Sequence, residues 1–140
     1  MALPDKIHLE VVTPEKQIFS GVVDSVTVPC KTGYMGVLPG HAPFLGEIGI
    51  GEIIFASGNR KDYIFCFWGF IEALPDRVVI LAQTAEMASD IDVKRAEEAK
   101  SRAEKFLSSK GPDVDFGRAE LALLRAISRL NAVKHRAAYR

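Results

Sequence analysis

Four charged side chains that should converge from two expected helices are the clearest chemical feature of the sequence. Asp92 and Arg95 fall on the apolar face of a helix expected near residues 91–108, where charges break the hydrophobic pattern. Arg125 and Arg129, on a second helix, lie at matching distances from the connection between the helices. In an antiparallel pair these groups meet at one end. They could form a binding site, or they could be a helix cap with a surface arginine pair.

Motifs for catalysis are absent from the sequence. The glycines of GEIGIGE (46–52) are spaced GxxGxG, no helix is expected after them, and no GxxxxGK[ST] stretch occurs. Nor is there a Ser/His/Asp set, an HExxH stretch or a paired-carboxylate motif. Cys30 and Cys66 are far apart, which favours two small buried hydrophobes over a metal or redox pair. We therefore expect a protein that is not an enzyme and requires no cofactor.

Charge and composition divide the 140 residues into two parts. Residues 1–88 hold 6 Lys and Arg against 10 Asp and Glu, and residues 89–140 hold 12 against 8, so the parts carry about −4 and +4. Nine of the twelve aromatic residues lie in the first part. We expect two domains with this boundary, no nucleic-acid partner, and a soluble chain without a signal peptide or membrane span.

The first part has the period-two pattern of β-strands. Ile7, Leu9 and Val11 alternate with polar residues, and turn signals follow one another closely, among them SGNR (57–60) and LPDR (74–77), which should each close a hairpin. The run YIFCFWGFIEAL (63–74) is apolar on both faces, which indicates a central strand or one that faces a partner. This part should be an antiparallel β-sandwich or flattened barrel.

The second part has the 3.6-residue period of helices. We expect one helix over 91–108, capped by Ser89 or Asp90, a stop at Gly111 and Pro112, and a second helix capped by Asp113 or Asp115. The short connection predicts an antiparallel hairpin, and hence an α+β protein. The facing stripes should be Ala96, Ala99, Ala103 and Phe106 on the first helix, and Phe116, Ala119, Leu123, Ile127, Leu130 and Ala137 on the second. Such alanine-rich stripes pack closely but bury little apolar area.

Two further surfaces invite a functional interpretation. The segment GVLPGHAPFLGEIGIGE (36–52) combines turn-forming glycine and proline with apolar residues that would normally be buried; its His41 could be an ordinary loop histidine. Residues 118–140 hold six Lys and Arg and a single Glu. A basic stripe on the second helix is either a solvated face or a surface for an acidic partner; it consists of Arg118, Arg125, Arg129 and Arg136.

Three stretches resemble a known family: LEVVTPEKQIFSG, GYMGVLPGHAPFL and ILAQTAE…IDVKRAEEAKSRAEKFL. They are similar to the epsilon subunit of bacterial and chloroplast rotary ATP synthases, and the match runs from about Ile7 to Val133. The resemblance implies a non-catalytic rotor subunit that links the gamma subunit to the c-subunit ring and inhibits ATP hydrolysis through its helices. It also implies a peripheral position on the cytoplasmic face of a bacterial plasma membrane, without insertion into it.

The resemblance also implies roles for particular residues. The basic stripe would contact the alpha/beta catalytic head when the hairpin extends along gamma. Some relatives have a carboxylate at position 34, so here packing of a tyrosine ring would replace a charged contact to the c ring. The residues facing gamma or the c ring would be Tyr34, Val37, Leu38, His41, Phe44 and Leu45. ATP would bind the folded-down hairpin as a regulatory ligand, without hydrolysis, at Glu86, Ile91, Asp92, Arg95, Ala96, Arg125 and Arg129.

A second hypothesis comes from a different class of protein. The chain could be a free-standing β-sandwich binding module with an oligomerising helical hairpin. Co-purification with a gamma subunit, against formation of a stable homo-oligomer, distinguishes the two.

Overall fold

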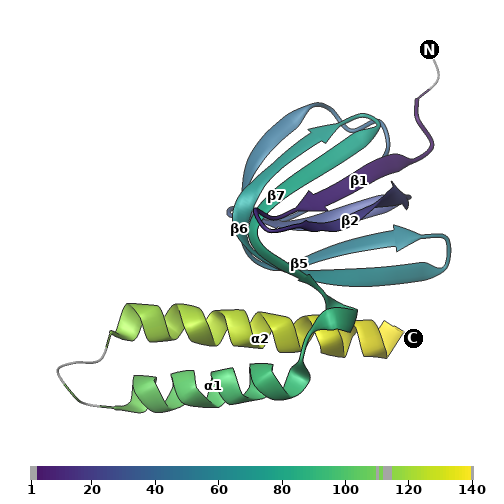
Figure 1. Ribbon diagram of the computed structural model, residues 1–140. Helices are drawn as coiled ribbons and strands as arrows, with labels where there is room; N and C mark the ends of the chain where they lie inside the picture. The colour runs from purple at the N-terminus through teal and green to yellow at the C-terminus, as the bar shows by residue number, and fades with distance from the viewer. Residues whose placement is uncertain (1–2, 110, 112–114, 140) are drawn as a thin grey trace.

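The computed structural model describes residues 3–109, 111 and 115–139, and within them seven strands precede two α-helices (Figure 1). The strands are β1 (Ile7–Val12), β2 (Gln17–Val23), β3 (Ser25–Cys30), β4 (Gly33–Val37), β5 (Phe44–Ser57), β6 (Arg60–Leu74) and β7 (Arg77–Met87). The helical part consists of the 3-10 turn η1 (Ala88–Asp90), α1 (Val93–Ser108) and α2 (Phe116–Tyr139). The expected order of a β-sandwich followed by a helical hairpin is confirmed.

The strands form one sheet that folds over on itself, in the order β2-β1-β7-β6-β5-β3-β4. The rings of Phe19 on β2 and Phe55 on β5 lie 4.4 Å apart, although these strands are not hydrogen-bonded neighbours. One pair, β1 with β7, is parallel, whereas the sequence predicts antiparallel pairing throughout. A parallel pair is possible here because a long stretch of chain separates the two strands, so that no tight turn has to join them.

Both predicted hairpin turns are present. Ser57 pairs with Arg60 around a two-residue loop in which Gly58 has φ 61°, a left-handed conformation that glycine adopts without a steric penalty. Leu74 pairs with Arg77 around Pro75 and Asp76. These turns join β5, β6 and β7 into a meander, so that the segment 63–74 becomes a central strand, as its apolar pattern indicates.

The sandwich core is built from the inward-facing residues of the strands. Val37 and Ile48 are fully buried in it, because Val37 pairs with Val26 on β3 and Ile48 points inward from β5. The sandwich itself therefore covers these two residues, which corrects the expectation that Val37 faces gamma or the c ring. Cys66 is buried as predicted, Cys30 is half-buried, and both thiols are free.

The side-chain alternation of β6 reverses at Trp68, which has φ 51°. Before it, Ile64 and Cys66 face the core; after it, Ile71 and Ala73 do. The neighbouring glycine is required, because a Cβ on Gly69 would lie 2.0 Å from the carbonyl oxygen of Leu81. The outer face of β6 is therefore split: α2 covers the first half, and the second half is exposed.

The cap of α1 is Asp92, whose Oδ1 accepts a hydrogen bond from the backbone N–H of Arg95 at 3.1 Å. The predicted caps, Ser89 and Asp90, belong to η1 instead, so α1 begins at Val93 and not at residue 91. Asp115 caps α2 as predicted, through the N–H of Arg118 at 3.1 Å. The alternative cap, residue 113, and the stop at residue 112 lie outside the described residues.

The two helices pack through alanines, with α2 between the sandwich and α1 (Figure 1). Ala96 and Ala103 on α1 are buried, as are Ala119 and Ala126 on α2. Phe106 and Phe116 are exposed, contrary to the predicted stripes, because they lie toward the far end of the hairpin, away from the sandwich. Ala137 is also exposed.

Candidate functional site

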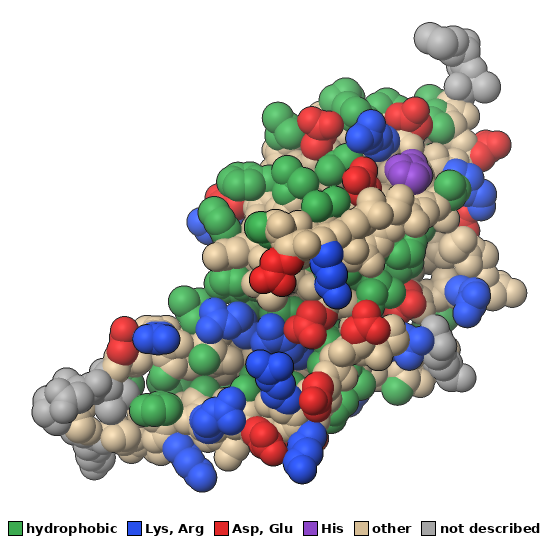
Figure 2. Space-filling model, in the orientation of Figure 1, with side chains coloured by type: hydrophobic (Ala, Val, Ile, Leu, Met, Phe, Trp, Pro, Cys, Tyr) green, Lys and Arg blue, Asp and Glu red, His purple; other side chains and the backbone are tan. Residues whose placement is uncertain are grey.

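The basic stripe of α2 packs on the acidic sandwich. Arg129 Nε lies 2.6 Å from Glu86 Oε1, and its guanidinium lies 4.4 Å from the ring centre of Phe65. Arg136 Nε lies 3.2 Å from Asp62 Oδ1. In Figure 2 the Lys and Arg side chains gather on the hairpin, and acidic side chains lie beside them where the hairpin meets the sandwich.

These contacts show that the stripe is not a solvated face while the hairpin is docked. Three of its four arginines face the sandwich, since the guanidinium of Arg125 also lies over Phe67, 5.0 Å from the ring centre. Arg118 alone of the four is exposed. The physical cause is the opposite charge of the two parts, which favours their contact.

A histidine and a buried carboxylate complete the docking contact. Glu52 on β5 is the only charged side chain that is buried among the described residues, at 6% exposure. His135 Nδ1 on α2 lies 2.9 Å from each of its carboxylate oxygens, and the imidazole ring stands 6.0 Å from that of Tyr63. Burial raises the pKa of Tyr63. Undocking the hairpin would break this pair. In the docked state His135 gives the Glu52 carboxylate a partner, without which its burial would be costly.

A polar pocket of ≈ 710 Å³ lies between the hairpin and the sandwich. The structure brings together six of the seven residues that the resemblance assigns to a nucleotide: Glu86, Ile91, Asp92, Arg95, Ala96 and Arg129. Arg125 does not line the pocket, because its side chain extends over Phe67 instead. The predicted convergence is therefore confirmed for Asp92, Arg95 and Arg129, and is wrong for Arg125.

The pocket also has basic residues that the sequence analysis missed. Arg102 follows Arg95 by two helical turns on the same face of α1, a spacing from which it could have been predicted. Lys16 comes from the turn between β1 and β2, and no sequence pattern connects it to the helices. In this structure Asp92 acts as the helix cap, as the structural alternative predicts, and Glu86 is paired with Arg129.

The residues expected to face gamma or the c ring differ in exposure. Tyr34, Leu38 and Leu45 are 59%, 64% and 75% exposed. His41 is half-buried, with Nδ1 2.6 Å from the carbonyl oxygen of Ala42. Val37 is in the core and is removed from the set, because strand alternation turns it inward. Phe44 is also corrected in part, since its half-buried ring packs against the core.

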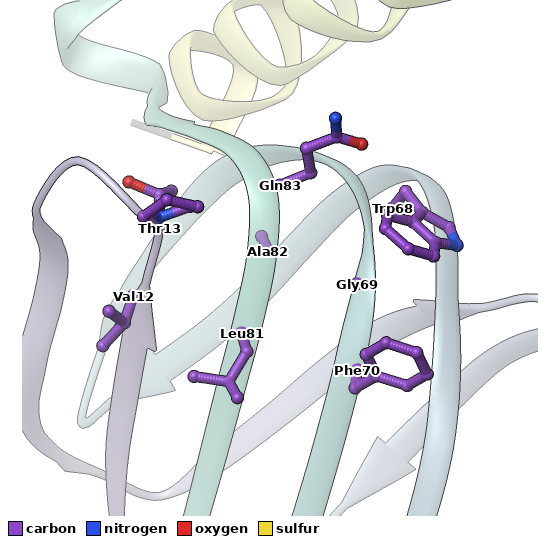
Figure 3. Close-up of a pocket in the computed structure, with 9 residues that line it drawn as sticks. Val12, Thr13, Trp68, Gly69, Phe70, Leu81, Ala82 and Gln83 are labelled. Carbon is purple, nitrogen blue, oxygen red and sulfur yellow. The ribbon is translucent and has the colours of Figure 1, made fainter.

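An exposed apolar patch, formed by Trp68, Phe70 and Leu81, lies on the uncovered half of the outer face (Figure 3). The rings of Trp68 and Phe70 meet edge to face at 5.7 Å, and the patch borders an open hollow of ≈ 460 Å³ that Val12 also lines. The apolar run 63–74 is evident in the sequence, but its pattern does not predict which of its residues stay exposed. Three neighbouring exposed large hydrophobes, two of them aromatic, are typical of a protein-binding surface.

Glu47 borders this patch. Its Oε1 accepts a hydrogen bond from the Trp68 indole N–H at 2.9 Å and lies 3.1 Å from Lys31 Nζ. These two contacts, the indole first, lower the pKa of Glu47. The carboxylate therefore fixes the orientation of an exposed aromatic side chain.

The described residues contain no group of His, Cys, Asp and Glu side chains that could hold a metal ion. Within the same residues, no helix has the length and apolar character needed to cross a membrane. What this part of the chain offers is a binding surface, a polar pocket and a docked hairpin.

These features define a class of two-part binding proteins, in which a β-sandwich carries an exposed apolar patch and a helical hairpin closes a polar pocket against it. The chain belongs to the ATP synthase delta/epsilon chain family: residues 6–88 match its β-sandwich domain and residues 89–134 match its long α-helix domain. The family resemblance noted in the sequence is thereby confirmed.

Curated relatives named ATP synthase epsilon chain are similar over most of their length. The relative from Syntrophobacter fumaroxidans is 43% identical over 132 residues, which cover 94% of this chain and 98% of that one. The relative from Halalkalibacterium halodurans is 44% identical over 126 residues, covering 89% and 95%. The relative from Koribacter versatilis is 46% identical over 111 residues, covering 79% and 78%.

Solved structures share the fold. A chain in the Euglena gracilis mitochondrial ATP synthase, in a structure of OSCP/F1/c-ring, aligns with a TM-score of 0.81 at 24% identity, covering 96% of this chain and 85% of that one. A chain in the Tetrahymena thermophila mitochondrial ATP synthase central stalk/c-ring structure aligns with a TM-score of 0.54 at 14% identity, covering 96% and 98%.

Proposed function

We propose that this chain is a non-catalytic central-stalk subunit of a rotary ATP synthase, which links the gamma subunit to the c-subunit ring at the cytoplasmic face of a bacterial plasma membrane. Besides the family membership, the observation that carries this proposal is the exposed apolar patch. Trp68, Phe70 and Leu81, with Leu45 on the adjoining strand, form a surface that a partner would bury.

Different parts of the exposed surface of the sandwich would contact the gamma subunit and the c ring. The patch on β6 and β7 is the gamma contact, together with His41. Tyr34, at the β3–β4 end, and Leu38, just after β4, are the c-ring contact. The hydroxyl of Tyr34 accepts a hydrogen bond from the backbone N–H of Glu52 at 3.2 Å, which anchors the ring while leaving much of it exposed.

Charge substitutions within and outside the patch test the gamma contact. Phe70→Asp and Leu45→Asp should leave the thermal melt of the chain nearly unchanged but abolish co-purification with gamma, because a buried unpaired charge is costly. Val22→Asp is the matched control, since Val22 is 59% exposed at the β2 edge of the sheet. Equal recovery of gamma by all three variants would contradict the assignment. A stable homo-oligomer that recovers no gamma would favour the free-standing binding module.

The hairpin is the regulatory part of the proposed subunit. Arg129 and Arg136 are occupied by Glu86 and Asp62 while the hairpin is docked, so an extended hairpin would expose their charges to an acidic surface of the alpha/beta head. The docked hairpin is then the non-inhibitory state. Deletion of residues 89–140 should preserve assembly and raise ATP hydrolysis by membranes. Unchanged hydrolysis would remove the inhibitory role and leave the stalk role intact.

ATP is the proposed ligand of the polar pocket. Arg95, Arg102 and Arg129 supply positive charge for phosphates. Binding without hydrolysis is expected, because neither a phosphate loop nor an activated nucleophile is found in the sequence.

Titration calorimetry on the full-length chain tests this directly. Arg95→Ala and Arg102→Ala should weaken ATP binding, and Arg118→Ala, an exposed arginine outside the pocket, should not. No heat at millimolar ATP, or equal affinities for all three variants, would show that the arginines are only a structural cluster.

A further inference from the structure

The pocket between hairpin and sandwich receives one basic side chain from the sandwich. Its other basic residues, Arg95, Arg102 and Arg129, belong to the helices. Among the residues that line the pocket, Lys16 alone brings positive charge from the β-part, at the turn between β1 and β2.

The backbone of this turn is held by three hydrogen bonds. The Thr13 N–H donates to the Lys16 carbonyl at 2.9 Å, the Thr13 hydroxyl donates to the same oxygen at 3.1 Å, and the Lys16 N–H donates to Thr13 Oγ1 at 3.2 Å. Pro14, next to Thr13, further restricts the loop. The Lys16 side chain is exposed and makes no ion pair with the described residues. A fixed backbone thus presents an available ammonium group to the pocket.

The origin of each charge determines what a ligand can do to the hairpin. A ligand shifts a two-state equilibrium only through contacts that differ between the states. Arg95, Arg102 and Arg129 move with the helices, so an anion held by them alone could remain bound after the hairpin leaves the sandwich. A contact to Lys16 exists only while the hairpin is docked.

We infer that Lys16 is the residue through which a polyphosphate ligand holds the hairpin against the sandwich. This inference rests on the proposed nucleotide binding and assigns its regulatory effect to a particular group. Glu86 and Glu15, which also line the pocket, are acidic and cannot attract the phosphates in the same way. The ammonium of Lys16 therefore couples ligand charge to hairpin docking.

The test compares Lys16→Gln with Lys94→Gln in the full-length chain. Both variants remove one exposed positive charge, but Lys94 lies on α1 outside the pocket lining. ATP affinity is measured by calorimetry, and docking by hydrogen exchange of the α2 amides over 129–136, with and without saturating ATP.

We expect ATP to slow exchange over 129–136 in the wild-type chain and in Lys94→Gln. In Lys16→Gln this extra protection should be lost, with affinity reduced by about three- to tenfold, as for one partly exposed charge-assisted contact. If the wild-type chain binds ATP and Lys16→Gln retains the full extra protection, whatever its affinity, the inference is wrong. If the wild-type chain does not bind ATP, the proposed nucleotide function itself fails.

Discussion

Trp68 is a single residue with three unusual properties. It is the only tryptophan in the chain, it has φ 51° within a strand, and its side chain is 43% exposed. A left-handed conformation is unfavourable for a bulky residue and tends to persist where the surrounding structure requires it. Here it reverses the alternation of β6 and presents Trp68 next to Phe70 on the patch.

The Trp68–Glu47 contact predicts an acid-dependent fluorescence signal. Because the pKa of Glu47 is lowered in the folded chain, this contact stabilises the fold above the ordinary glutamate pKa of about 4.3 and loses its effect as pH falls through the lower folded value. Trp68 emission should therefore change as the pH falls below the ordinary glutamate pKa, while circular dichroism still reports a folded chain. The change should be absent in Glu47→Gln; its persistence there would assign it to another group.

The two cysteines should differ in reactivity. Burial raises the pKa of the Cys66 thiol to about 12, so almost no thiolate is present at pH 8, and the side chain is inaccessible. Iodoacetamide should leave Cys66 unmodified in the native chain and alkylate both thiols in urea, as read by mass spectrometry. Native modification of Cys66 at the rate of Cys30 would show that this part of the core opens.

At the scale of elements, the decisive contact is that of α2 with β5 and β6. α1 packs against α2, and α2 carries the side chains that meet the sheet. The Glu52–His135 pair includes the most buried charged side chain of this contact, Glu52, at 6% exposure. Docking therefore depends on a few side chains between Arg125 and Arg136 and not on the alanine seam between the helices.

His135→Ala should weaken docking of the hairpin. Its loss leaves the Glu52 carboxylate buried without a partner, which costs about 1–3 kcal/mol. Hydrogen exchange of the last two turns of α2 should accelerate while the strands stay protected. Glu52→Gln should have a smaller effect because it removes the charge, and Lys134→Ala, an exposed neighbour, should have none. Equal exchange in His135→Ala and wild type would refute the importance of the pair.

Opposite net charges on the sandwich and the helical part help to hold the whole molecule together. The sandwich part carries a net charge of about −4 and the helical part about +4, and the pairs Arg129–Glu86 and Arg136–Asp62 lie at their contact. The total is zero, so the composition of the complete chain hides this attraction. The same charges that dock the hairpin are the ones proposed to bind elsewhere when it extends.

Salt should therefore loosen the two parts without unfolding either. The screening length falls from about 10 Å at 0.1 M to about 3 Å at 1 M ionic strength, which weakens half-exposed pairs. With sodium chloride raised over this range, exchange over 129–136 should accelerate, while the core amides of β6 and β7 remain protected. Unchanged exchange over 129–136 would mean that apolar packing at Phe65 and Ala132 holds the hairpin by itself.

The sequence alone determined the elements and the ligand-like charge cluster. The alternation of β1, the turns at 57–60 and 74–77, and the presence of two helices were correct because they depend on residues a few positions apart. Asp92, Arg95 and Arg129 could be placed together because two antiparallel helices with a short connection leave little freedom in their alignment.

Only the tertiary structure decided which faces are covered. Val37 turned inward, Arg125 turned onto Phe67, and Trp68, Phe70 and Leu81 stayed exposed. Lys16 joined a pocket whose other basic residues lie about eighty or more positions away. The physical reason is that local periodicity defines a face, whereas its burial depends on which distant surface packs against it, through strand register, a parallel β1–β7 pair and the docking of oppositely charged parts.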